Sequence, residues 1–96
     1  MRFRKKPVVV EAFQFSSPES ARQIVEWSAG AVKMGTEIRN HSTEHPDGFD
    51  YPCLLVATRE GTMTASVGDW VVKGIRGEFY PVKPDIFEMT YEAVIG

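Results

Sequence analysis

The chain has 96 residues and a mass of 10.8 kDa, which is the size of one domain. Hydrophobic residues make up 43% and charged residues 25%, which excludes a disordered chain, a coiled coil and a collagen-like repeat. A net charge of −2 excludes a generally basic nucleic-acid-binding protein. The single cysteine, Cys53, excludes a disulfide framework and a multi-cysteine zinc site within one chain. Residues 1–96 are therefore expected to form a single domain.

The start of the chain is basic but does not have the pattern of a secretion signal. The apolar run behind residues 2–6 is only Val8 to Val10, shorter than the roughly 7–15 residues of a signal core. No stretch approaches the roughly 20 apolar residues that span a bilayer. We therefore expect a cytosolic protein without membrane contact, in which Cys53 is reduced and packed among its apolar neighbours, residues 54–56.

The first predicted element is a strand over residues 7–15, which are rich in β-branched and aromatic side chains. Apolar groups fall on both faces of this segment, which predicts a central strand covered on each side.

An amphipathic helix is predicted at about residues 17–29. Ser17 suits the N-cap, Pro18 suits the first helical position, and apolar residues follow at helical spacing. Gly30 is placed to end the helix in a left-handed conformation.

The remainder predicts short strands joined by tight turns, with a polar loop at 41–50 and a short helix at about 85–91. Asp85 and Glu88 have the spacing of a capping box for that helix. The tail, residues 92–96, is expected to add an edge strand or to pack irregularly. The remaining strands are expected at 36–40, 52–58, 62–67, 70–73 and 78–82. The fold class is α+β: a mainly antiparallel sheet of five to seven short strands with two helices.

A metal-site pattern occurs in the polar loop. His41, Glu44 and His45 match the H-x-x-E-H arrangement of one zinc-peptidase class. That chemistry needs both histidines on one face of a helix, whereas Pro46 and Gly48 favour a loop. The sequence therefore predicts no metal ligand, catalytic residue or cofactor, and a small metal-dependent hydrolase is a minor alternative.

Basic residues cluster in two places. Residues 2–6 carry four positive charges, so the rest of the chain carries a net −6. They are either a functional arm or a solvated guard for the edge of the first strand. A second group places three cations around three aromatics, a pairing that suits an anionic nucleotide-like ligand. Its members are Trp70, Lys73, Arg76, Phe79, Tyr80 and Lys83. The alternative is that Trp70 and Phe79 are core residues and the lysines only lie on the solvated surface.

Two segments carry a family resemblance. They are RKKPVVVEA at residues 4–12 and GDW-x(6)-GEFYPVKPDIF-x(2)-TYE at residues 68–92. Together they resemble a group of small, mostly uncharacterised proteins encoded by bacteriophages and prophages. The resemblance implies an accessory protein that acts in the cytoplasm of a bacterial host. It implies no activity, so no functional residue is transferred.

Two functions follow as hypotheses. The first is a non-enzymatic, homo-oligomeric binding module that sequesters a small anionic ligand in host-defence evasion, with a pocket between subunits. The second is an interaction module that binds a host protein through an exposed sheet edge or the basic arm. Nucleic-acid binding would require both basic clusters to share one face, and it is a minor possibility.

Overall fold

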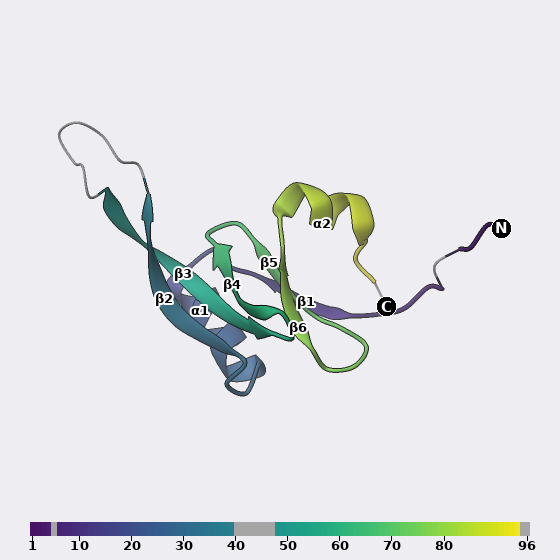
Figure 1. Cartoon of the computed structure of the whole chain (residues 1–96), viewed down its shortest axis with the longest axis horizontal. Coiled ribbons are helices and arrows are strands. Elements are labelled where there is room, and N and C mark those ends of the chain that lie inside the picture. The colour runs from purple at the N-terminus through teal and green to yellow at the C-terminus, as the bar shows by residue number, and fades with distance from the viewer. Residues whose placement is uncertain (5, 40–47, 95–96) are drawn as a thin grey trace.

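The strands divide between two antiparallel sheets in a computed structural model, which describes residues 1–4, 6–39 and 48–94 (Figure 1). The first sheet has the order β1-β5-β6 and the second has the order β2-β3-β4. The elements are β1 (Glu11–Gln14), α1 (Pro18–Trp27), β2 (Val32–Arg39), β3 (Phe49–Thr58), β4 (Gly61–Ser66), β5 (Trp70–Lys73), β6 (Phe79–Val82) and α2 (Pro84–Thr90). The predicted α+β class is confirmed. The single sheet is wrong, because the strands form two sheets of three.

Local signals at its N-terminus explain α1. The Ser17 side chain accepts a hydrogen bond from the Ser20 N–H at 3.1 Å, and Ser20 Oγ accepts one from the Ser17 N–H at 2.9 Å. Pro18 occupies the first turn, where its missing N–H costs nothing. The predicted helix is confirmed, although it ends at Trp27, two residues before the expected boundary.

Both predicted hairpins are present. β3 and β4 pair from Cys53↔Ser66 to Thr58↔Gly61, and β5 and β6 pair over their full length. β2 is longer than the strand expected at 36–40, and β3 begins inside the expected loop 41–50. Residues 40–47 lie outside the described part of the chain.

The predicted central position of the first strand is wrong. β1 covers only Glu11–Gln14 and lies at the edge of its sheet, paired with β5. Its first residue, Glu11, pairs with Lys73, the last residue of β5, so residues 7–10 extend past the end of their neighbour. Val9 is consequently 77% exposed.

The cap expected for the second helix is also wrong. α2 begins at Pro84, with Lys83 at the N-cap and no side-chain cap hydrogen bond. Asp85 and Glu88 therefore both lie within the helix, because Pro84 already starts the first turn. Tail residues 92–94 have no regular structure.

One apolar core joins α1 to both sheets. Ile24 of α1 is fully buried with side chains from β2 to β6, including Leu54, Val71 and Phe79. Asp69, which is 4% exposed, fixes the link between the sheets: its Oδ2 accepts hydrogen bonds from the Ser66 N–H at 2.9 Å and from Lys83 Nζ at 3.0 Å. Among the described residues, neither helix is long and apolar enough to cross a membrane.

Candidate functional site

The predicted ligand-binding residues lie on two faces of the first sheet. The ladder pairs Val72 with Tyr80 and Lys73 with Phe79, and directly opposed side chains share a face while neighbours in a strand alternate. Tyr80 therefore lies on one face with Trp70, whereas Lys73 and Phe79 lie on the other. Of the six, Phe79 and Tyr80 line a cavity of about 250 Å³ with residues of the β3–β4 hairpin, whereas the sheet separates Lys73 from Trp70 and Tyr80.

Trp70 and Tyr80 hold α2 on the sheet. The Trp70 ring stacks on Phe87 of α2, with centroids 4.0 Å apart and planes 5° from parallel. The hydroxyl groups of Tyr80 and Tyr91 lie 3.1 Å apart and share a hydrogen bond. These contacts give both aromatics a structural role in the isolated chain.

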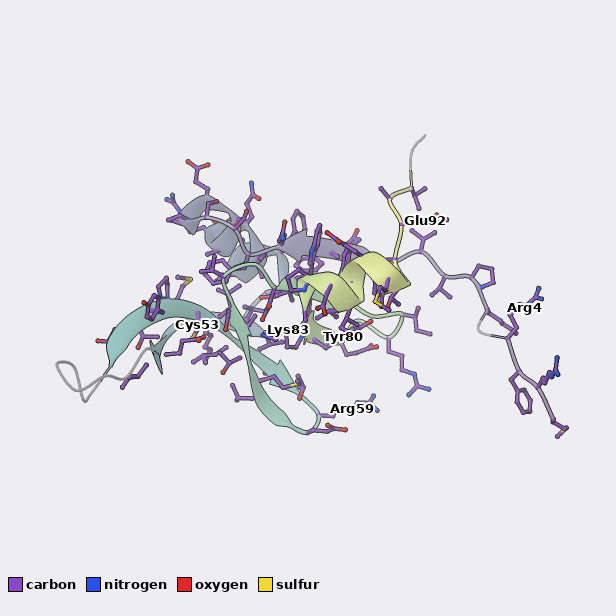
Figure 2. The ribbon with its side chains drawn as sticks, turned by 90° about the horizontal axis from the view of Figure 1, so that it is seen from above. Arg4, Cys53, Arg59, Tyr80, Lys83 and Glu92 are labelled. Carbon is purple, nitrogen blue, oxygen red and sulfur yellow. The ribbon has the colours of Figure 1, made fainter. Side chains whose placement is uncertain are left out.

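The opposite face packs against α1. Phe79 is 8% exposed and meets the Trp27 ring edge-on at 4.9 Å. Lys73 Nζ lies 6.0 Å from the centre of the Phe79 ring, and Arg76 is exposed in the following turn. Lys83 is paired with Asp69 and lies at the N-cap of α2, at the start of that helix in Figure 2. On this side Lys73 combines positive charge with proximity to an aromatic ring, and Arg76 adds a second exposed cation in the adjoining turn.

The environment of Tyr80 predicts how the stability of the fold depends on pH. Burial, the hydrogen bond to Tyr91 and the charge of Glu78 raise the pKa of Tyr80 to about 12. The ordinary tyrosine pKa is about 10, so the folded state retains a proton that the unfolded state loses. Stability should therefore fall as the pH rises from about 10 to about 12. An alkaline titration of tyrosinate absorbance should show one late-titrating group that disappears in Tyr80→Phe; a late group that persists would contradict the assignment.

A cavity of about 400 Å³ follows the outer edge of β1. Its lining is Val9, Val10, Glu11, Ala12, Phe13, Trp27 and Val94. Five of these residues are consecutive, and consecutive side chains of an extended segment point to opposite faces. The cavity therefore borders the edge of the strand, not one face of the sheet.

The backbone of β1 leaves this edge available for pairing. The Phe15 N–H donates to the Asp69 carbonyl at 2.9 Å, and the Phe15 carbonyl accepts from the Gly68 N–H at 2.7 Å. Because alternate residues of a strand direct their N–H and C=O groups to the same side, Ala12 and Gln14 direct theirs outward. In the described part of the chain, no backbone hydrogen bond reaches this outer side.

Aromatic side chains border the edge on the α1 side. The rings of Phe13 and Trp27 pack edge-to-face with centroids 4.8 Å apart. Trp27 Nε1 donates a hydrogen bond to Glu11 Oε2 at 3.0 Å, which holds the indole beside the strand. Phe13 remains 37% exposed. Sequence analysis missed this edge because it placed the first strand in the centre of a sheet, although the basic residues before it were a signal for an edge strand.

Residues 1–4 and 6–10, here termed the N-terminal arm, extend from this edge. Phe3 is 88% exposed, and Arg4 lies on the part that points away from the folded body (Figure 2). The base of the arm lies near the end of α2, where Lys6, Val8, Tyr91 and Glu92 help to line a cavity of about 290 Å³.

Cys53 is not a candidate nucleophile. It is fully buried, and burial together with the charge of Glu37 raises the pKa of its thiol. A raised pKa reduces the reactive thiolate. We expect a disulfide exchange reagent to modify Cys53 at neutral pH only in denaturant; rapid modification of the folded protein would contradict this expectation.

The zinc-peptidase pattern cannot be placed. His41, Glu44 and His45 lie outside the described residues. The described ranges contain no cluster of three His, Cys, Asp or Glu side chains that could hold a metal ion.

Comparison with known proteins gives no match: no family model, curated protein or solved structure is significantly similar to the chain. The resemblance to phage proteins therefore stays a prediction.

Proposed function

We propose that the protein is a non-enzymatic interaction module that binds an extended segment of another polypeptide along the outer edge of β1. The outward backbone groups of Ala12 and Gln14 carry this proposal. An added strand would gain main-chain hydrogen bonds there, while neighbouring side chains would select its sequence. Phe13 and Trp27 supply apolar contact area beside those groups.

The resemblance to phage proteins suggests the setting for this activity. A phage accessory protein acts in the bacterial cytoplasm, and its partner there is a host protein that it inhibits or redirects. The exposed cations of the N-terminal arm, Arg2 and Arg4, accelerate encounter with an acidic partner surface.

Site-specific crosslinking tests this proposal. A photo-crosslinking amino acid at position 13 should capture one stoichiometric partner from a host lysate, whereas the same group at Ile38 should not. Ile38 is the control because it is 55% exposed and lies on β2, in the other sheet.

A proline substitution identifies the backbone edge itself. Ala12→Pro removes an outward N–H without removing a bond to β5, and edge strands tolerate proline. We expect it to abolish crosslinking from position 13 while leaving the fold intact by circular dichroism. Capture that is unaffected by Ala12→Pro would reject the β1 edge as the binding site.

Sequestration of an anionic ligand is the second candidate. It is favoured by the position of Lys73 Nζ 6.0 Å from the Phe79 ring centre, with Arg76 in the adjoining turn. Calorimetric titration with linear and cyclic nucleotides should then release heat that is lost in the double variant Lys73→Gln, Arg76→Gln. Lys33→Gln is the control, because Lys33 is an exposed residue of β2. No heat with any nucleotide would reject this candidate.

A further inference from the structure

We propose that a second copy of this chain occupies the outer edge of β1, with the two N-terminal arms antiparallel about a two-fold axis through Val8. The inference rests on the proposed function, since it concerns the same edge: the second copy occupies the edge in the free protein, and a host segment would have to displace it. The assembly would be a continuous six-stranded sheet made from the first sheet of each copy.

Backbone geometry favours a second copy at this edge. A two-fold axis normal to a sheet places even-numbered residues of one strand opposite even-numbered residues of the other. The outward groups of Ala12 and Gln14 belong to the even set, to which Val8 and Val10 also belong. If residues 6–10 continue the alternation of β1, donors and acceptors of both copies meet along the whole edge.

Charge is complementary on the side of the sheet that α2 covers. Val8 and Val10 line a cavity of about 140 Å³ with Tyr80 and Tyr91, which places the even-numbered residues on this side. In an extended arm, Arg2, Arg4 and Lys6 share that side. They would therefore approach the α2 side of the second copy.

The α2 segment offers acids to these cations. Asp85, Glu88 and Glu92 are all exposed, while α2 and the residues that follow it carry no described cation. Arg4 lies away from the body of its own molecule (Figure 2), so an antiparallel second copy is the arrangement that brings it to such a surface.

Apolar groups match on the opposite side. With the axis at Val8, position 3 of one copy lies opposite position 13 of the other. Phe3 and Phe13 are 88% and 37% exposed in the single chain, and their contact would cover both rings beside Trp27. The same pairing covers Val9, which is 77% exposed.

A cysteine at the axis gives a direct test. Opposed residues of a hydrogen-bonded antiparallel pair have Cα atoms about 5.5 Å apart, which suits a disulfide. Val8→Cys, oxidised with diamide, should give a covalent dimer, whereas Ile38→Cys, on β2 of the second sheet and 55% exposed, should give no covalent dimer. Cys53 is fully buried and adds little background.

Sedimentation of the full chain supplies the second readout. The wild type should be a dimer whose dissociation constant rises with salt. The double variant Arg2→Glu, Arg4→Glu should raise the dissociation constant about tenfold, because ion pairs are lost and replaced by repulsion. Arg22→Glu should leave the dissociation constant unchanged, because Arg22 is an exposed residue of α1. Val10→Pro should prevent dimerisation, because it removes an outward donor.

The outcomes separate this inference from the proposed function. A monomer at all concentrations that still crosslinks to a host protein through position 13 would overturn the second-copy inference alone. A monomer with no crosslink through position 13 would remove both. A dimer that oxidises through Ile38→Cys and not through Val8→Cys would overturn the inference by assigning the interface to the second sheet.

Discussion

Replacing Ile24 with alanine should lower the free energy of unfolding by about 3–4 kcal/mol, since large-to-alanine changes in a packed core cost roughly 2–5 kcal/mol. Ile24 is fully buried and belongs to the core that α1 shares with both sheets. Its loss removes apolar area and leaves a cavity that the surrounding strands cannot fill without moving. Denaturant titration of the wild type and Ile24→Ala measures the difference.

The neighbouring residue gives the control for this experiment. Gln23 is exposed on the same helix, so Gln23→Ala should change stability by less than about 0.5 kcal/mol. Domains are stable by only about 5–15 kcal/mol, so Ile24→Ala removes a substantial share of the total. A loss below about 1 kcal/mol would mean that α1 is not packed on the two sheets in solution.

Local chemistry made parts of this fold predictable. α1 follows from Ser17 at the N-cap and Pro18 in the first turn, and both signals act within a few residues of chain. The two hairpins follow from β-prone segments separated by short turns, which force antiparallel neighbours.

The division into two sheets depends on contacts that no local pattern contains. Phe15 pairs with the backbone around Asp69, which places β1 beside β5 and leaves β1 at an edge. Residues 7–10 are apolar on both sides, which predicted burial, yet they extend past the end of β5 at Lys73. Residues 7–10 are exposed because β5 is too short to pair with them. The length of β5 is known only once the sheet is assembled.

The members of the predicted ligand-binding cluster lie on two faces of the sheet for a reason that the sequence already contained. Trp70 and Lys73 are three residues apart on one strand, so alternation places them on opposite faces. They were grouped because they are close in sequence, but their side chains lie on opposite faces of the strand. The basic residues before β1 were the only sequence signal for its edge, because its outward backbone groups become evident only once the pairing with β5 is known.

Replacing Trp70 with alanine should release α2 from the sheet and lower the free energy of unfolding by about 2–3 kcal/mol, below the roughly 3–5 kcal/mol of a fully buried tryptophan. The reason is that α2 lacks a side-chain cap and has no fully buried residue, so it depends on the stack between Trp70 and Phe87. Trp70→Phe keeps an aromatic face for Phe87 and should lose less than Trp70→Ala.

Amide hydrogen exchange separates release of α2 from general destabilisation. The Phe87 and Tyr91 amides donate to carbonyls within the α2 segment, so Trp70→Ala should speed their exchange more than that of the buried Val56 in β3. Phe87→Ala should have a similar effect, and combining the two should cost less than their sum, because either change alone removes the stack. Fully additive losses would show that Trp70 and Phe87 stabilise the protein independently.

Since the proposed dimer uses acids of the α2 segment, the release of α2 should also weaken dimerisation in Trp70→Ala, while Trp70→Phe should still dimerise.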